Sequence, residues 1–265
     1  MREARAVVAA CLAAIFVLLL TASPATAERG FLRGFADPLF ESTSERARWL
    51  DASRSEGASL AKVFVSWREV ATSRPDDPAN PADPAYDFGN LDATVRAAGE
   101  QGLRVLLGVQ FAPAWAEGKK RPDSAPAGTW KPDPGEFGSF MEALATRYSG
   151  SFSEGLGQQL PRVADFQAWS EPNLNLYLTP QYKGKKLAAS DHYKRLLNAA
   201  ADGVRRVHSD NRVVTAGLAP YGDARGGDRT RPLQFWRDVF CLKGRALKPG
   251  RGCAPTGGCS GPGVS

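Results

Sequence analysis

Five apolar segments of strand length alternate with longer amphipathic segments along this chain. The strand-like segments are residues 30–36, 60–66, 104–110, 163–169 and 212–218, and the helix-like segments are residues 44–56, 88–101, 134–148, 188–208 and 232–240. This alternation predicts βα units, because each helix carries the chain back to the start of the next parallel strand. The sequence therefore predicts an α/β fold with a parallel sheet.

The loops on the two sides of the predicted sheet differ in length. Those that follow strands are long and rich in Pro, Trp and Asp, notably residues 67–88 and 111–133, whereas the helix-to-strand connections are short. In a TIM (β/α)8 barrel the loops at the C-terminal ends of the strands carry the function. A doubly wound sheet would instead show a glycine-rich phosphate-binding turn, which residues 30–37 lack. The pattern favours a fold of the TIM-barrel type.

The barrel-like pattern ends after five βα units. Residues 245–265 consist mainly of Gly, Pro, Ser, Cys and basic residues without a periodic apolar pattern, which predicts an unstructured tail. A complete eightfold barrel takes about 250 residues. We therefore expect residues 28–244 to form a partial barrel in a chain that is truncated at its C-terminal end. An interrupted reading frame and a naturally short protein both explain such a chain.

The N-terminus has the pattern of a secretory signal peptide. Arg2 and Arg5 precede the apolar residues 6–20, and residues 25–27, Ala-Thr-Ala, fit a cleavage site. The alternative is an uncleaved membrane anchor, but a spanning helix needs roughly 20 apolar residues. We expect residues 1–27 to be removed and the protein to be secreted, with no membrane association afterwards.

Cysteines and charge are both concentrated near the C-terminal end. Cys241, Cys253 and Cys259 remain after the predicted cleavage, so one disulfide and one free thiol are expected, and a bond between Cys241 and Cys253 would close a short loop. The formal net charge is +6, and residues 237–265 hold five basic residues against one acidic residue. Because residues 28–236 are nearly neutral and show no basic stripe interleaved with aromatics, we predict no nucleic-acid partner.

Several other chemistries have little support in the sequence. The two histidines, His192 and His208, lie on one polar helical stretch with no cysteine or carboxylate at ligand spacing. The sequence has no Gly-x-Ser-x-Gly nucleophile elbow and no phosphate-binding loop. We therefore expect no metal site and no cofactor.

The fourth predicted strand ends in the segment DFQAWSEPN, residues 165–173. Apolar alternation up to Trp169 is followed by Glu171 and Pro172, and a proline does not continue strand pairing. The break therefore presents Glu171 at the mouth of the predicted barrel. A carboxyl group in this place can act as a general acid toward a leaving group if burial against tryptophans raises its pKa.

The segment AWSEPN resembles the Trp-Asn-Glu-Pro signature of the large clan of retaining glycoside hydrolases with (β/α)8 barrels. This clan includes the cellulases of family five and the xylosidase and iduronidase relatives. The segments KVFVSWREV and VLLGVQFAPAWA resemble the second-strand and third-strand segments of the same clan, and the resemblance extends over roughly residues 30–240. It implies that Glu171 is the acid/base, that Lys62 and Trp67 belong to the second-strand exit, and that Trp115 lies beside the sugar.

The chain departs from the pattern of the clan at three places. Ser170 stands where the relatives have asparagine. Lys62 stands where they have arginine, and a lysine cannot donate the two parallel hydrogen bonds of a guanidinium group. The nucleophile of the clan is a second glutamate at the end of the seventh strand, and no seventh strand is recognisable here. Retaining hydrolysis needs two carboxyl groups about 5 Å apart, so the sequence supplies one of the two.

Eight residues are predicted to bind the substrate near Glu171: Trp67, Trp115, Trp169, Ser170, Asn173, Lys62, Asp37 and Tyr221. For Trp67 and Trp115, packing in the hydrophobic core explains a tryptophan at this position as well as stacking on a sugar does. Asp37 is equally explained as a turn-forming residue and Tyr221 as an interfacial tyrosine. Both interpretations stay open at this point.

The resemblance implies a secreted glycoside hydrolase that acts on a glycan or a β-glycoside through Glu171. Because the nucleophile is not recognisable, we expect this chain alone to have little or no activity. The first alternative is a non-catalytic carbohydrate-binding protein that uses Trp67, Trp115 and Trp169 as a stacking platform, or an inert fragment. The second is an unrelated βα-barrel enzyme in which Glu171 points away from the strand-end cleft.

Overall fold

The structure is a computed structural model of the chain that describes residues 31–154, 158–244 and 247–249. The chain divides into two compact units, Met1–Arg33 and Gly34–Ser265. Of the first unit, residues 31–33 are described and have no regular secondary structure. The predicted signal peptide and two of the cysteines, Cys253 and Cys259, lie outside the described residues. Cys241 is disulfide-bonded, and its partner also lies outside them.

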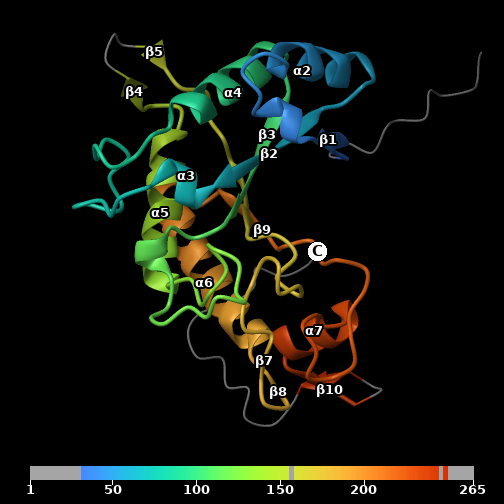
Figure 1. The fold of residues 1–265 in the computed structure, drawn as a ribbon. Coiled ribbons are helices and arrows are strands. Elements are labelled where there is room, and N and C mark those ends of the chain that lie inside the picture. The colour runs from blue at the N-terminus through green and yellow to red at the C-terminus, as the bar shows by residue number, and fades with distance from the viewer. Residues whose placement is uncertain (1–30, 155–157, 245–246, 250–265) are drawn as a thin grey trace, which may run out of the picture. The chain divides into compact units, whose positions relative to one another are not determined.

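The second unit is built on a five-stranded parallel sheet (Figure 1). Its strand order is β1-β2-β3-β6-β9, and every neighbouring pair is parallel. The strands are β1 (Gly34–Ala36), β2 (Leu60–Ser66), β3 (Arg104–Gln110), β6 (Asp165–Ala168) and β9 (Arg212–Val214). The predicted parallel α/β sheet is confirmed. The strands lie in the sheet in the same order as in the sequence, as they would in the first five units of a barrel. Closure into a barrel of eight strands stays a prediction.

The helices lie where the amphipathic segments predict them, within two residues at either end. They are α2 (Arg46–Ser55), α4 (Gly89–Glu100), α5 (Pro134–Arg147), α6 (Ala189–Val207) and α7 (Pro232–Val239), with the shorter turns η1 (Pro38–Phe40), α3 (Trp67–Val70) and η2 (Ala114–Ala116). Pro134 opens α5 in the first turn, where its missing N–H is not needed. The preceding Asp133 accepts hydrogen bonds from the N–H groups of Gly135 and Glu136, which explains why the helix begins at this point.

Three predicted strands are longer than those observed, and the fourth spans Asp165–Ala168 in place of residues 163–169. The first starts at Gly34 and not at residue 30, and the last ends at Val214 and not at residue 218. After Val214, side chains make the hydrogen bonds that a neighbouring strand would otherwise make. Gln167 donates to the carbonyl of Thr215, and the N–H of Ala216 donates to the hydroxyl of Tyr193 at 2.7 Å. The backbone groups of this segment are therefore satisfied without a further strand pairing.

Three short antiparallel hairpins complete the described structure. They are β4 (Ser153–Glu154) with β5 (Gln158–Gln159), β7 (Tyr182–Lys183) with β8 (Lys186–Leu187), and β10 (Leu242–Lys243) with β11 (Lys248–Pro249). The last hairpin includes residues that the sequence analysis assigned to an unstructured tail. Paired structure therefore extends beyond residue 244, while residues 250–265 of the predicted tail lie outside the described part of the chain.

The two faces of the sheet are buried to different extents. On β2 the side chains of Ala61, Val63 and Val65 are buried, while Lys62 and Phe64 on the other face are partly exposed. This alternation follows from the two-residue period of a strand. The buried face forms one apolar core with the helices, and α5 and α6 lie together on one side of β2 and β3 (Figure 1). The second face corresponds to the interior of the predicted barrel.

Two features hold the helix layer together. Gly138 on α5 and Gly203 on α6 face each other so closely that a Cβ atom on Gly203 would overlap the Gly138 carbonyl. Asp92 on α4 is buried and accepts hydrogen bonds from the Arg147 guanidinium and from the Tyr148 hydroxyl. Such a pair is strongly destabilising to break, since one charge would stay buried without its partner. Among the described residues no helix is long and apolar enough to cross a membrane.

Candidate functional site

The segment that follows β6 places Glu171 at the C-terminal edge of the sheet. Trp169 and Glu171 adopt left-handed backbone conformations, with φ of 67° and 41°. The N–H of Glu171 donates to the Gly217 carbonyl at 3.0 Å, and its own carbonyl accepts from the N–H of Leu174 at 3.0 Å. These bonds hold Glu171 beside the segment that leaves β9. Left-handed conformations of side-chain-bearing residues cost of order 1 kcal/mol each and concentrate at functional sites.

The charge of Glu171 acts on two side chains from other parts of the site. Burial lowers the pKa of the Lys62 ammonium, and the carboxylate of Glu171 opposes this shift. Burial raises the pKa of the Tyr177 hydroxyl, and the charges of Glu171 and Tyr221 raise it further. A strand residue, two loop residues and the carboxyl group are therefore electrostatic neighbours at this edge of the sheet.

Room for the Lys62 side chain comes from a glycine on the neighbouring strand. A Cβ atom on Gly108 of β3 would lie 3.0 Å from Cε of Lys62 and 3.5 Å from Oε1 of Gln167. The Lys62 ammonium lies over the Phe64 ring, 4.9 Å from its centroid. Lys62 of β2 and Gln167 of β6 therefore both approach Gly108 from the two strands that flank β3.

Trp67 and Trp169 are core residues, which corrects their prediction as sugar-stacking residues. Both are fully buried. Trp67 stacks on Phe140 at a centroid distance of 5.5 Å, and Trp169 packs edge-on against Phe137 at 5.5 Å. Their ring faces are occupied by protein, so neither presents a surface to a ligand. Trp115 packs at 87° against Trp67, and it is partly exposed.

Asn173 has a structural role in place of the predicted contact with substrate. It is fully buried, and its amide donates to the carbonyls of Ala219, Tyr221 and Thr230, while its carbonyl accepts from the N–H of Ala219 at 3.0 Å. All its hydrogen-bonding capacity is directed at backbone groups. The side chain therefore joins the loops after β6 and β9 and fixes the base of the Glu171 turn.

The remaining predicted residues occupy different positions around the strand ends. Ser170 is partly exposed next to Glu171. Asp37 accepts from the N–H of Leu39 at 2.9 Å and caps η1, which is the turn-forming role considered for it above. Tyr221 is 51% exposed and lines a cavity of about 980 Å³. Of this group, Ser170 is accessible beside Glu171, Tyr221 is accessible at the cavity, and Asp37 caps the turn that follows the first strand.

Phe111 and Tyr177 form an accessible aromatic pair that the sequence analysis missed. Their ring centroids are 5.7 Å apart with an interplanar angle of 31°, and both are partly exposed. The Arg68 guanidinium lies over the Phe111 ring at 4.9 Å. Phe111 is the first residue after β3 and Tyr177 follows Glu171 by six positions, so their places after strands were the available signal.

Glu41 is a second unpredicted group near the strand ends. Burial raises the pKa of its carboxyl group to about 7. Its Oε1 accepts a hydrogen bond from the N–H of Phe64 at 2.8 Å and thereby satisfies β2 beyond the end of β1. Glu41 lines a separate cavity of about 260 Å³ with Ser66 and Glu69.

A metal ion would need several ligating side chains close together in the described part of the chain. No cluster of three or more His, Cys, Asp or Glu side chains is present there. His192 is half-buried and held in its neutral form: Nε2 donates to the Pro132 carbonyl at 2.8 Å and Nδ1 accepts from Arg195 at 3.1 Å. Burial lowers its pKa to about 4.

Comparison with known proteins supports a glycosidase-like fold. No family model and no curated protein matches the sequence. Among solved structures, a GH39 enzyme from Xanthomonas axonopodis pv. citri superposes with a TM-score of 0.52 at 17% identity, covering 73% of this chain and 36% of that enzyme. A glucosidase from Croceicoccus marinus gives 0.48 at 18% identity, covering 73% and 38%, and an endoglucanase from Thermotoga maritima gives 0.40 at 17% identity, covering 70% and 48%. The chain spans less than half the length of each of these proteins, and its fold is similar to part of theirs.

Proposed function

We propose that Glu171 is the general acid/base of a retaining glycoside hydrolase site. The observation that carries this proposal is the position of Glu171, partly exposed at the C-terminal end of β6 and electrostatically coupled to Lys62 and Tyr177. Strand ends on this side are where βα-barrel enzymes carry their catalytic groups. The similarity to part of a glycoside hydrolase fold supports the same interpretation.

The proposed reaction uses Glu171 twice. Its protonated carboxyl group donates a proton to the glycosidic oxygen while a second carboxylate attacks the anomeric carbon and forms a glycosyl-enzyme bond. The resulting Glu171 anion then takes a proton from water as that water cleaves the intermediate. Lys62 stabilises the anion between the two steps, and the Phe111–Tyr177 pair offers an apolar face to a sugar ring.

The second carboxylate of this mechanism is not assigned to a residue of the chain. We therefore expect turnover by the 265-residue protein alone to be low, while glycan binding beside Glu171 is retained. A non-catalytic carbohydrate-binding protein is the second candidate, with Phe111 and Tyr177 as its platform in place of the buried tryptophans.

Calorimetric titration and a panel of 4-nitrophenyl β-glycosides test the proposal. The titrants are cello-, xylo- and mannohexaose and a sugar-shaped imidazole whose ring nitrogen occupies the position of the glycosidic oxygen. We expect Tyr177→Ala to weaken glycan binding by about fivefold because it removes a stacking face worth about 1 kcal/mol. Leu176→Ala, at the exposed neighbouring position, should leave the affinity unchanged. Glu171→Gln should weaken binding of the imidazole by about tenfold or more and that of the neutral glycans much less.

The outcomes separate the candidates. Failure of every neutral glycan and of the imidazole to bind, without turnover, would contradict the proposed function. If the protein binds glycans but Glu171→Gln leaves the affinity for the imidazole unchanged, the result would instead identify a non-catalytic binding protein. Substantial turnover that Glu171→Gln abolishes would support the catalytic role of Glu171 and contradict the expected low activity.

A further inference from the structure

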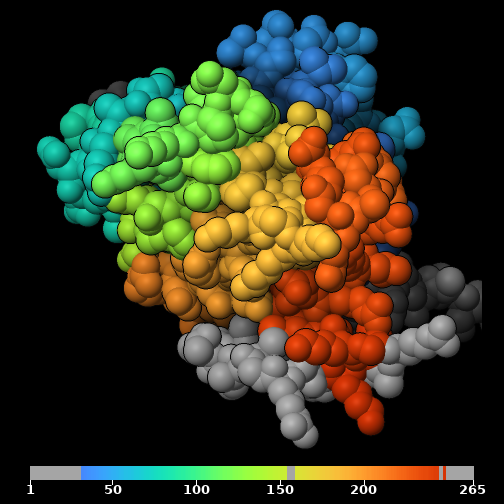
Figure 2. Space-filling model, turned by 60° about the horizontal axis from the view of Figure 1, so that its bottom comes forward, coloured from blue at the N-terminus to red at the C-terminus, as the bar shows by residue number. Residues whose placement is uncertain are grey.

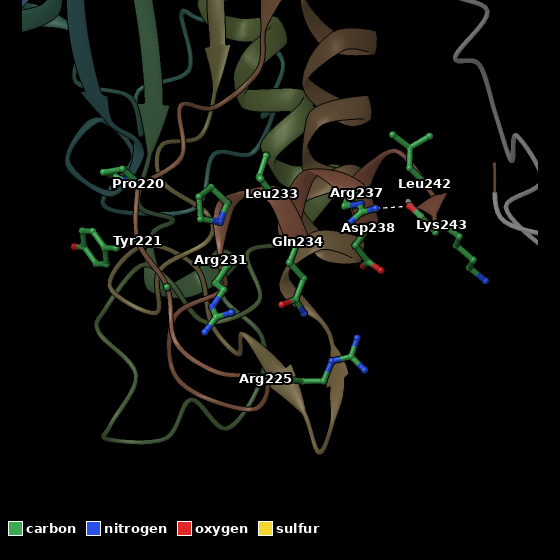
Figure 3. Close-up of a pocket in the computed structure, with 13 residues that line it drawn as sticks. Pro220, Tyr221, Arg225, Arg231, Leu233, Gln234, Arg237, Asp238, Leu242 and Lys243 are labelled. Atoms are coloured by element: carbon green, nitrogen blue, oxygen red, sulfur yellow. Dashed lines mark hydrogen bonds between the residues drawn. The ribbon is translucent and has the colours of Figure 1, made fainter. Parts of the chain in front are cut away.

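Beyond Tyr221 the surface opens into a large cleft with a basic lining. Its first cavity, about 980 Å³, lies along the start of α7 and the segment before it (Figure 3). A second cavity of about 640 Å³ reaches from α7 to the β7–β8 hairpin. The β7–β8 segment also lies next to α7 in Figures 1 and 2. The two cavities share six lining residues: Arg225, Gln234, Arg237, Asp238, Leu242 and Lys243. We refer to both together as the basic cleft.

Positive charge dominates this lining. Six basic side chains face the basic cleft and two acidic ones accompany them: Lys185, Lys186, Arg225, Arg231, Arg237 and Lys243, with Asp191 and Asp238. Both acids already have partners. Asp238 accepts a hydrogen bond from the Ser190 hydroxyl, and Asp191 pairs with Lys186 at 3.6 Å. Six basic side chains against two acidic ones leave a formal excess of four positive charges in the described lining.

Several cationic groups in the basic cleft are available to a ligand. Within the described ranges, Arg225, Arg231 and Lys243 make no ion pair or hydrogen bond through their side chains, and all three are exposed. Arg231 and Gln234 extend from the start of α7 toward the segment that carries Arg225 (Figure 3). Arg237 donates to the Gly244 carbonyl, and its Nε is buried without a partner among the described residues. The exposed side chains of Arg225, Arg231 and Lys243 can therefore pair with a bound anion.

The backbone of α7 adds to the positive electrostatic potential of the basic cleft. The first turn of α7, from Pro232 to Gln234, lines the basic cleft. Helix N-termini favour anions, since the aligned peptide dipoles leave partial positive charge there. Each of the two cavities, about 980 and 640 Å³, is of the size found for ligand sites, about 300–1,000 Å³ per pocket.

We propose that the basic cleft binds the carboxylate or sulfate groups of an anionic glycan whose chain continues from the Glu171 site. This inference rests on the proposed function and names its substrate class. Tyr221 connects the two places, because it lines the basic cleft and its carbonyl accepts a hydrogen bond from the amide of Asn173, two residues after Glu171. A glycan fits better than a nucleic acid: Tyr221 is the single aromatic residue of the described lining, whereas single strands need several stacking rings.

Titration of the full chain with four probes of similar length tests this inference. The probes are a heparin-derived hexasaccharide, an oligogalacturonate hexamer, cellohexaose and a single-stranded DNA hexamer. We expect at least one anionic glycan to bind tenfold or more tighter than cellohexaose at low ionic strength, with an affinity that falls as salt is added. The sulfated and uronate arms distinguish the two sources of negative charge.

The variant that reports on the basic cleft is the double substitution Arg225→Gln with Arg231→Gln. It should weaken the anionic glycan by about tenfold or more, reduce the salt dependence and leave cellohexaose unchanged. Arg205→Gln is the matched control, because Arg205 is exposed on α6 about 20 Å along the helix from Asp191 and makes no recorded contact with other described residues. Arg205→Gln should change neither affinity nor salt dependence.

Three results would overturn the inference, and each differs from failure of the proposed function. Cellohexaose binding without any preference for the anionic glycans would leave the Glu171 proposal intact and remove this one. Anionic binding that the double variant does not weaken would place the ligand elsewhere. Tighter binding of the DNA hexamer than of either anionic glycan would identify a nucleic-acid surface. Failure of every glycan, neutral and anionic, contradicts both proposals.

Discussion

Single residues at the end of β6 determine where Glu171 lies. Trp169 and Glu171 adopt left-handed backbone conformations, and these persist because Asn173 and Gly217 hold the turn from two sides. Trp169 itself is anchored through its Nε1, which donates to the Tyr177 carbonyl at 2.8 Å. The acid is therefore presented by a turn that the surrounding loops hold in place.

Asn173 is the residue in this turn with the largest expected effect on stability. Asn173→Ala leaves three backbone carbonyls and one N–H without their side-chain partner, so we expect it to lower the free energy of unfolding by about 3 kcal/mol. Urea unfolding followed by circular dichroism measures this. Asn175→Ala in the same loop, where the side chain is only partly buried, should stay within about 0.5 kcal/mol. A loss below 1 kcal/mol for Asn173→Ala would show that water replaces the amide.

His192 and Glu41 should give the stability of the protein opposite dependences on pH. Burial lowers the pKa of His192 to about 4, so the unfolded chain binds more protons between pH 4 and 6.5 and stability rises with pH there. Burial raises the pKa of Glu41 to about 7 from 4.5, so the folded chain binds more protons and stability falls with pH between 4.5 and 7.

Thermal unfolding of two variants between pH 4 and 8 separates these contributions. Relative to wild type, His192→Gln should make stability rise less steeply with pH, and Glu41→Gln should make it rise more steeply. Gln at position 41 keeps an acceptor for the N–H of Phe64, so the comparison isolates the titrating group. Equal slopes in all three proteins would mean that neither group titrates differently in the folded and unfolded states.

At the scale of elements, the close approach of α5 and α6 determines how the outer layer packs. Gly138 and Gly203 allow the two helix backbones to touch. The Arg147–Asp92 pair then connects α5 to α4 inside the core. The helices therefore reach the sheet as one layer, which keeps the strand ends aligned at the candidate site.

Gly203→Ala tests this contact directly. A methyl group there overlaps the Gly138 carbonyl, so we expect a loss of about 2 kcal/mol from overpacking, despite the better helix propensity of alanine. Gly99→Ala on α4 is the matched control, since its Cβ would meet Pro161 at an ordinary 3.4 Å. The control should be neutral or stabilising by up to about 1 kcal/mol in urea unfolding. Similar effects of both substitutions would refute the role of the α5–α6 contact.

At the scale of the whole molecule, the sheet exposes both a face and an edge. Phe64 and Leu106 are partly exposed on the face of the sheet opposite the apolar core. Val214 is 38% exposed on β9, the last strand of the described sheet. Open strand edges with apolar side chains are sites of intermolecular pairing.

The 265-residue chain is therefore expected to associate with itself at micromolar concentration. Val214→Lys introduces an inward-pointing charge on the edge strand and should reduce this association. Light scattering coupled to size-exclusion chromatography measures it across a dilution series. Leu176→Lys removes a similarly exposed apolar side chain from a loop and should have little effect. A wild-type chain that stays monomeric throughout would contradict this prediction.

The sequence predicted the elements well and the accessible site residues less well. β2 and β3 match their predicted bounds, because a strand buried on one face has an apolar period that is local in sequence. Trp67 and Trp169 were predicted at the substrate because they stand at strand exits in segments that resemble the glycosidase clan, but burial depends on what packs against them. Phe137 and Phe140, on a helix some 70 residues after Trp67, cover them.

By itself, the sequence determined the parallel α/β pattern and the position of Glu171 after the fourth predicted strand, because periodicity and a proline break are properties of neighbouring residues. Tertiary structure alone decided that Phe111 and Tyr177 form an accessible aromatic pair, since the two residues come from separate segments. It also decided where charge collects. Residues 28–236 are nearly neutral when counted along the chain, yet Lys185, Arg225 and Arg231 converge with Arg237 in one cleft, because folding brings distant residues together regardless of their average charge.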